Sequence, residues 1–164
     1  PSDHVTRPYS LLRRLPDRRL RGLDFRQEDA EILPMVHAAR RLASDRGLRV
    51  IGSAWSAPWW MKTNASVLGQ WRIWPHTVGW LRPSCYDAYA RYLSAFLGHY
   101  RDQGLDVFGV TAVNEPDNPQ WHWPSMAMTP RQQALFISRY LAPRLEADGL
   151  GDVRIMCWDH NYST

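Results

Sequence analysis

The sequence has few cysteines, the residues that form disulfide cross-links and CxxC metal sites. It contains two cysteines, Cys85 and Cys157, which are too few and too far apart for a disulfide framework or a CxxC metal site. We expect Cys157 to be a buried free thiol, because it lies in an apolar run. Lys62 is the only lysine, so the net charge of +4 comes almost entirely from arginine.

Long apolar runs and targeting signals are also missing from the sequence. No run reaches the roughly 18 apolar residues of a membrane-spanning helix, so we expect no transmembrane segment. The opening PSDHVTRPYS lacks the basic and apolar regions of a signal peptide. The sequence therefore does not decide between a secreted and a cytoplasmic protein, because we expect the segment to belong to a longer chain. No repeat or composition break marks a second domain, so residues 1–164 are predicted to form one incomplete domain.

Positive charge is concentrated near the N-terminus, where seven arginines lie between Arg7 and Arg26. A nucleic-acid patch is one interpretation. No nucleic-acid motif accompanies the cluster, and short charge runs usually form a solvated face. The prediction is therefore a solvated surface without a nucleic-acid partner.

Helix and strand patterns alternate along the chain. Helical spacing of apolar residues, with glycine stops, predicts helices over 28–45, 84–103 and about 129–147; short apolar runs predict strands near 49–54, 107–113 and 153–158. This alternation is typical of a parallel α/β sheet or barrel. A (β/α)8 barrel needs about 250 residues, so the 164 residues here are predicted to be a segment of one.

Polar and aromatic clusters follow each predicted strand. They are WSAPWWMKTN from Trp55 to Asn64, then Asn114-Glu115-Pro116, then Asp159-His160-Asn161. In a (β/α)8 barrel the loops at the carboxyl ends of the strands build the active site. Glu115 at such a strand end suits acid/base work, although a solvated loop glutamate is the simpler alternative.

The motifs WSAPWWMKTN, VTAVNEP and WDHN, in this order and spacing, resemble glycoside hydrolase family 30, which includes glucosylceramidases and β-1,6-glucanases. LRPSCYDAYARYLSAFLGHY and WPSMAMTPRQQALFISRYLAPRLEADGL resemble the helices on either side of the family's acid/base strand. SDHVTRPYS, with Asp3, Arg7 and Tyr9, resembles the segment after its second strand, although SLLRRLP then departs from the pattern. The resemblance implies a barrel segment from the exit of strand 2 to strand 5.

The resemblance also implies a retaining β-glycosidase that hydrolyses an O-glycosidic bond of an oligosaccharide or glycolipid. Glu115 would be the general acid/base, Asn114 would bind the sugar 2-hydroxyl, Trp55 would line the subsite of the cleaved sugar, and Asp3 would bind its outer hydroxyls. The nucleophile would follow the seventh strand, outside this chain, so the fragment alone is expected to be inactive. This chemistry uses two carboxyl groups, and no metal or organic cofactor is expected.

Several assignments stay open at the level of the sequence. A non-catalytic carbohydrate-binding homologue is the alternative to an enzyme, and specificity, endo or exo action and oligomeric state are undetermined. Trp59 and Trp60 suit packing as well as stacking. His160 is predicted to be a hydrogen-bonded scaffold residue, because no partner lies at zinc-ligand spacing. Lys62 is predicted to pair structurally with a neighbouring carboxylate or carbonyl.

Overall fold

A three-stranded parallel sheet forms the frame of the protein in a computed structural model, which describes residues 9–12, 16–43, 47–71 and 77–161. Strands β1 (Val50–Ser53), β2 (Val107–Thr111) and β3 (Arg154–Met156) lie side by side in chain order. Ser53 lies opposite Thr111, and Thr111 lies opposite Met156. The carboxyl ends of the strands therefore meet at one rim, and the predicted α/β alternation is confirmed.

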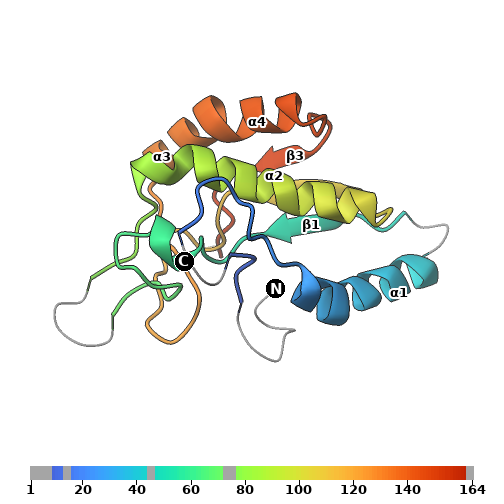
Figure 1. The fold of residues 1–164 in the computed structure, drawn as a ribbon, viewed down its shortest axis with the longest axis horizontal. Helices are drawn as coiled ribbons and strands as arrows, with labels where there is room; N and C mark the ends of the chain where they lie inside the picture. The colour runs from blue at the N-terminus through green and yellow to red at the C-terminus, as the bar shows by residue number, and fades with distance from the viewer. Residues whose placement is uncertain (1–8, 13–15, 44–46, 72–76, 162–164) are drawn as a thin grey trace.

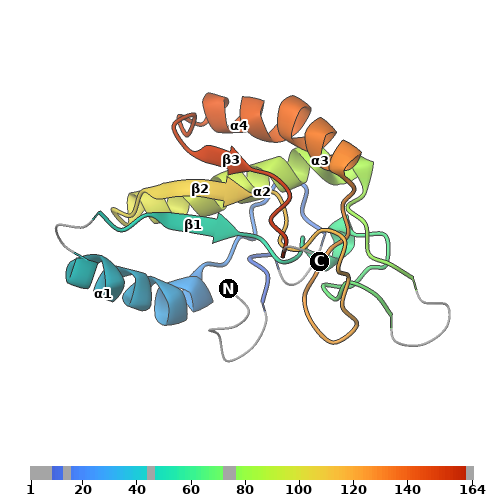
Figure 2. The same cartoon turned by 180° about the vertical axis from the view of Figure 1, so that it is seen from behind.

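Helices make the crossovers that parallel strands require. Helix α1 (Leu33–Ala43) follows a π-helical turn, Glu28–Ile32, and lies near β1 (Figure 1). Helix α2 (Tyr86–Asp102) joins β1 to β2, and α3 (Pro130–Phe136) with α4 (Ala142–Ala147) joins β2 to β3. Short 3-10 turns occupy Trp59–Met61 and Pro83–Cys85. Helices α2 to α4 cover one face of the sheet, and Figure 2 shows the other face turned away from them, as the inside of a barrel wall is.

Helix ends follow the local signals in the sequence. Gly104 and Gly149 both have φ of +73°, a left-handed conformation that glycine adopts without strain, and each follows the end of a helix. At the start of α3 the Thr129 side chain accepts from the backbone N–H of Gln132, and the Gln132 side chain accepts from the N–H of Thr129. This capping box, with Pro130 in the first turn, begins the helix where the sequence predicts it.

The helical segment after β2 is less regular than predicted. A π-helical turn, Ile137–Leu141, separates α3 from α4, and Pro143 lies in the first turn of α4. Proline has no N–H to donate and its ring crowds the preceding turn, so a wider turn just before it lets the helix continue. Helical periodicity alone predicts one uninterrupted helix here.

One aromatic stripe of α2 packs on the sheet and forms much of the core. Tyr89, Leu93, Leu97 and Tyr100 are each less than 4% exposed, and the hydroxyl of Tyr89 donates to the carbonyl of Ala112 at 2.9 Å. The hydrogen bond connects the helix to the residue that follows β2. The core thus fixes the position of the strand end that precedes the NEP motif.

The end of the third strand departs from the prediction. Strand β3 ends at Met156 rather than near 158, and Cys157 is a free but exposed thiol, not a buried one. The apolar run predicts burial, but Cys157 comes after the last residue of β3, and among the described residues no further strand pairs with the outer side of β3. Cys85, by contrast, is buried at 2% exposure in the core.

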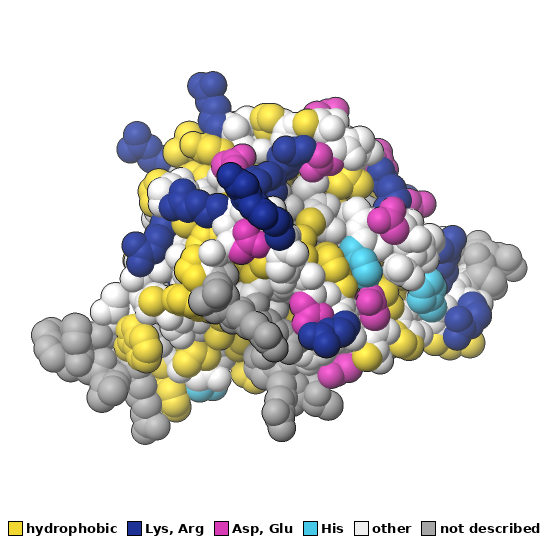
Figure 3. Space-filling model, in the orientation of Figure 1, with side chains coloured by type: hydrophobic (Ala, Val, Ile, Leu, Met, Phe, Trp, Pro, Cys, Tyr) yellow, Lys and Arg dark blue, Asp and Glu magenta, His cyan; other side chains and the backbone are white. Residues whose placement is uncertain are grey.

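Some of the arginines on the surface lie beside acidic side chains (Figure 3). Ion pairs join Arg26 to Asp24 and Arg91 to Asp87, and the guanidinium of Arg18 donates to the carbonyl of Ser84 at 3.2 Å. These contacts fit a solvated, locally neutralised face. Within the described ranges, no helix has the length and apolar character needed to span a bilayer.

Candidate active site

The three polar clusters predicted at the strand ends meet at one rim. The backbone N–H of Asn114 donates to the carbonyl of Ala54 at 2.8 Å, which places Asn114 beside the start of the Trp55 cluster. The N–H of Glu115 donates to the carbonyl of Asp159 at 2.8 Å, and Asn114 and Asp159 form an isolated parallel bridge. Ala54, about 60 residues before Asn114, and Asp159, about 45 residues after Glu115, therefore both lie next to this pair of residues.

Both carboxylate oxygens of Glu115 are held by side-chain amides. The Nδ2 group of Asn118 donates to Oε2 at 2.8 Å, and the Nδ2 group of Asn161 donates to Oε1 at 2.7 Å. Asn118 belongs to the loop after β2 and Asn161 to the segment after β3, so two loops fix one carboxylate. Glu115 remains partly exposed, which leaves it open to a ligand in solution.

The backbone of Glu115 is strained. Its φ is +44°, in the left-handed region that costs a residue with a Cβ about 1 kcal/mol or more. Trp158, at φ +55°, shares this conformation just after β3, where its N–H donates to Oε1 of Gln133 at 3.1 Å. Strain of this kind persists only where the surroundings hold it, and it concentrates at functional sites.

A hydroxyl and carboxylate network supports the strand ends beneath Glu115. The Oγ of Ser53 donates to Oδ2 of Asp159 at 2.7 Å and lies 2.9 Å from Oγ1 of Thr111. Asp159 thereby links β1 and β2 to the segment after β3. The sequence places Asp159 in a polar cluster but gives no sign of Ser53 and Thr111, because they lie within otherwise apolar strands.

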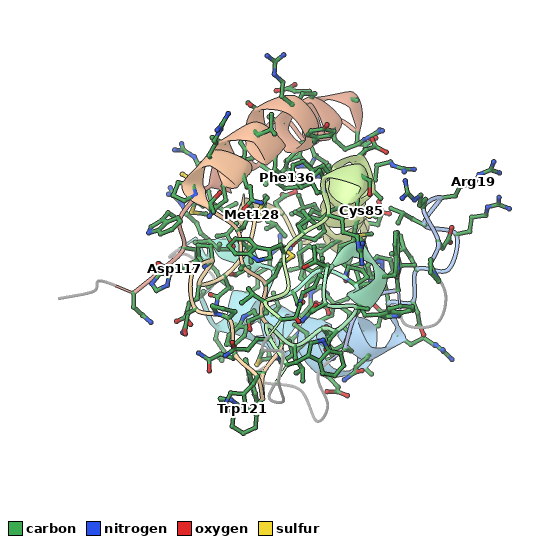
Figure 4. The ribbon with its side chains drawn as sticks, turned by 90° about the vertical axis from the view of Figure 1, so that its left-hand side faces the viewer. Arg19, Cys85, Asp117, Trp121, Met128 and Phe136 are labelled. Atoms are coloured by element: carbon green, nitrogen blue, oxygen red, sulfur yellow. The ribbon has the colours of Figure 1, made fainter. Side chains whose placement is uncertain are left out.

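Tryptophans border the rim. The rings of Trp55 and Trp123 contact edge to face, with centroids 5.8 Å apart at 64°. Trp123, in the loop after β2, is not among the site residues that the sequence predicts. Trp121 is 42% exposed and extends to the outer edge of the molecule in Figure 4, which looks onto the rim. Trp60 is instead buried at 9% exposure, so that member of the cluster packs in the core.

Lys62 ties the loop after β1 to the loop after β2. Its side chain is fully buried, and Nζ lies 2.6 to 3.0 Å from four oxygens, the hydroxyl of Ser56 and the carbonyls of Val67, Leu68 and Ser125, among which its protons are shared. Burial lowers the pKa of Lys62 to about 7. The prediction that Lys62 pairs with a neighbouring carbonyl is confirmed.

His160 lies on the outer side of the site. Its Nε2 lies close to Oδ1 of Asp117, its Nδ1 lies 3.2 Å from the carbonyl of Asn161, and its ring stacks near Trp158. These are the contacts of a scaffold residue. In the part of the chain that the structure describes, no three His, Cys, Asp or Glu side chains are grouped so that they could hold a metal ion.

A mainly apolar cavity of about 270 Å³ lies beside β1, away from the carboxylate of Glu115. Trp55 and Ser56 line one part of it, and Glu28, Tyr100 and Tyr9 line another. Asp3 and Arg7, which the sequence resemblance groups with Tyr9, lie outside the described residues. The structure thus places three of the four predicted site residues, Trp55, Asn114 and Glu115, at the same rim.

Comparison with known proteins identifies the family. The family model for the glycosyl hydrolase family 30 TIM-barrel domain matches residues 1–164. The chain belongs to glycosyl hydrolase family 30. The resemblance found in the sequence is therefore confirmed, and the parallel α/β structure is part of a TIM-barrel domain.

Curated relatives include two kinds of glycosidase. Endo-1,6-beta-D-glucanase BGN16.3 of Trichoderma harzianum is 34% identical over 130 residues, covering 75% of this chain and 26% of the relative. Lysosomal acid glucosylceramidase of Mus musculus is 30% identical over 161 residues, covering 96% of this chain and 30% of the relative. The chain spans less than a third of either relative.

Solved structures share the fold. SrfJ from Salmonella typhimurium superposes with a TM-score of 0.81 at 29% identity, over 93% of this chain and 32% of SrfJ. The endo-beta1,6-glucanase BT3312 superposes with a TM-score of 0.71 at 30% identity, over 90% of this chain and 31% of BT3312.

Proposed function

We propose that a protein carrying this chain is a retaining β-glycosidase in which Glu115 is the general acid/base. The observation that carries the proposal is the carboxylate of Glu115 at the end of β2, partly exposed and held by Asn118 and Asn161. A strained backbone at φ +44° supports it, because such strain is retained where geometry matters for function. Family membership supplies the reaction class.

The other predicted residues receive roles around this carboxylate. Asn114, one residue before Glu115, would hydrogen-bond the 2-hydroxyl of the cleaved sugar, a contact that strengthens in an oxocarbenium-like transition state. Trp55 would present its ring to the apolar face of that sugar, next to Trp123. Asp3 would bind two outer hydroxyls, as a carboxylate can.

Hydrolysis with retention of the anomeric configuration requires a second carboxyl group about 5 to 5.5 Å from the first, to attack the anomeric carbon. We infer that this nucleophile follows the seventh barrel strand and that residues 1–164 run from the exit of strand 2 to strand 5. Residues 1–164 alone should then show no turnover. Assays of activity therefore need a protein of family length that contains this chain.

The substrate class we propose is a β-glycoside, either a β-1,6-glucan or a glucosylated lipid. Each choice rests on the name of a relative: an endo-1,6-beta-D-glucanase at 34% identity and a lysosomal acid glucosylceramidase at 30%. A second candidate, a carbohydrate-binding homologue without catalysis, would keep the same rim but lack the nucleophile. Hydrolysis of either substrate by the family-length protein separates the two functions.

Glu115→Gln tests the acid/base role directly. We expect hydrolysis of substrates with poor leaving groups to fall about 10² to 10⁴-fold, because they need a proton at the departing oxygen. Glycosylation by an activated aryl glycoside should fall much less, and azide should partly restore turnover by attacking the glycosyl-enzyme without base help. Glu146→Gln, an exposed glutamate on α4, is the matched control. Equal loss on both substrates without azide rescue would rule out this role.

A further inference from the structure

The amide of Asn118 lies between Glu115 and Gln120. Its Nδ2 donates to Oε2 of Glu115 at 2.8 Å, and its Oδ1 accepts a hydrogen bond from Nε2 of Gln120. If the amide turned over, Oδ1 would face the carboxylate and Nδ2 would face another N–H donor. Both contacts would be repulsive, so Gln120 and Glu115 together hold Asn118 in one orientation.

Gln120 is itself anchored to the neighbouring loop. Its N–H donates to Oγ of Ser125 at 2.7 Å, and its carbonyl accepts from the N–H groups of Gly69 and Gln70 at 2.8 and 3.2 Å. A Cβ on Gly69 would lie 2.2 Å from Ser125 Oγ, so this close approach of the two loops requires glycine. Lys62 then holds the carbonyl of Ser125 at 2.6 Å.

The two loops thus form a relay that ends on the carboxylate. It runs from the buried Lys62 through Ser125 to Gln120, then through Asn118 to Glu115. Asn161 reaches the other oxygen of Glu115 from the segment after β3. Both oxygens therefore accept from amides of two different loops, and a hydrogen bond to an ionised carboxylate is stronger than one to a neutral acid.

We propose that Asn118 is a positioning residue for the base form of Glu115 and that Gln120 acts through Asn118. The proposal rests on the acid/base role of Glu115. It assigns Asn118 chiefly to the second half-reaction, in which the ionised carboxylate removes a proton from the water that attacks the glycosyl-enzyme. In the first half-reaction Glu115 carries a proton, and the donor of Asn118 contributes less.

Asn118→Asp keeps the side-chain shape, removes the donor to Glu115 and puts a second carboxylate beside it. In the family-length protein, with dinitrophenyl β-glucoside as the probe, we expect deglycosylation to slow about 10- to 100-fold, the scale of one hydrogen bond to a charged group. The pre-steady-state burst should persist, KM should fall together with kcat because the glycosyl-enzyme accumulates, and azide should raise the steady-state rate. Gln103→Leu, an exposed amide after α2, is the control without change.

A double-mutant cycle tests the relay. Gln120→Leu should slow deglycosylation about 3- to 10-fold in the parent, less than Asn118→Asp, and add almost nothing in the Asn118→Asp background. If Asn118→Asp fails to fold by thermal unfolding, Gln120→Leu carries the same burst and azide measurements one residue further from the carboxylate. A full additional loss in the double variant would overturn the relay.

The two proposals fail differently. If Glu115→Gln leaves turnover of poor leaving groups intact, the acid/base role of Glu115 is wrong, whatever Asn118 does. If Glu115→Gln behaves as an acid/base variant while Asn118→Asp and Gln120→Leu keep parental deglycosylation and azide response, only the positioning role is overturned. Slowed deglycosylation with a retained burst supports both.

Discussion

Two charged side chains in neighbouring loops of the same rim are held in opposite ways. Lys62, after β1, is fully buried, and four oxygens surround its amino group. Glu115, after β2, is partly exposed and receives two amide donors, one on each oxygen. The lysine uses its donors within the protein, whereas the glutamate keeps a side free for a ligand.

The difference distinguishes a charged side chain that holds the loops together from one that is accessible to a substrate. A buried charge with all its partners inside the protein holds loops together, and a reactive charge needs access to substrate as well as support. Glu28 adds a third case: it is 3% exposed, Tyr100 donates to it, and burial raises its pKa. Burial of a titratable group therefore does not by itself mark the active site. Unfolding experiments on variants of Lys62, Glu28 and Glu115 test how each of these side chains affects stability.

The largest expected effect is that of Lys62→Met. The change leaves buried carbonyl oxygens without a donor, at about 1 to 3 kcal/mol for each unsatisfied group, so we expect the free energy of unfolding to fall by about 3 kcal/mol or more. Urea-induced unfolding measures it. Arg131→Met, at an exposed position on α3, is the control and should change stability by less than about 0.5 kcal/mol.

The pH dependence of Lys62 sharpens this prediction. Burial lowers its pKa to about 7 in the folded state, against about 10.4 when unfolded. Between these values the unfolded state binds more protons, so the free energy of unfolding should rise with pH above about 7. Lys62→Met should lose that rise. A variant with the parental slope, or one as stable as the parent, would show that Lys62 is not the structural centre of the two loops.

A smaller effect is expected for Glu28→Gln. Because burial raises its pKa in the folded state, Glu28 contributes stability that is complete below its unfolded pKa of about 4.3 and is lost as pH rises through the folded pKa. Glutamine removes that loss, so the variant should be more stable than the parent at pH 7 and similar at pH 4. Unfolding at several pH values measures the two curves. A less stable variant at pH 7 would mean that the hydrogen bond from Tyr100 outweighs burial.

Much of this architecture follows from local patterns. Apolar periodicity and the glycines after the helices predict the crossovers and the strands, since each depends on neighbouring residues. The exposed Cys157 and the π-helical turn before Pro143 depend on sheet edges and helix geometry. A run of apolar letters does not contain that information.

The site also contains residues that local sequence patterns predict and residues that only the folded structure reveals. Glu115, Asn114 and Trp55 follow strands directly, so their meeting at one rim is a consequence of a parallel sheet. Asn118, Gln120 and Ser53 contribute through contacts between loops distant in sequence. Their roles depend on which amide faces which carboxylate, and only the folded geometry determines that. Asn118 lies three residues after Glu115, a spacing at which a turn can bring the two together, and this was the one available local signal.

The smallest expected effect lies in the backbone of Glu115 and compares two substitutions at one position. Glu115→Ala and Glu115→Gly both remove the carboxylate and its two hydrogen bonds, so the difference between them reports the cost of φ +44°. Alanine keeps a Cβ that clashes in the left-handed region, and glycine does not. We expect the glycine variant to be the more stable of the two by roughly 0.5 to 1 kcal/mol in urea-induced unfolding. The control is Ala134→Gly at an exposed position in α3, where glycine should instead cost about 1 kcal/mol. The opposite signs at the two positions would show that residue 115 is held in a conformation that stability alone would not select. If alanine were the more stable residue at both positions, the strain would be absent, and the contrast with Lys62 would rest on solvent access alone.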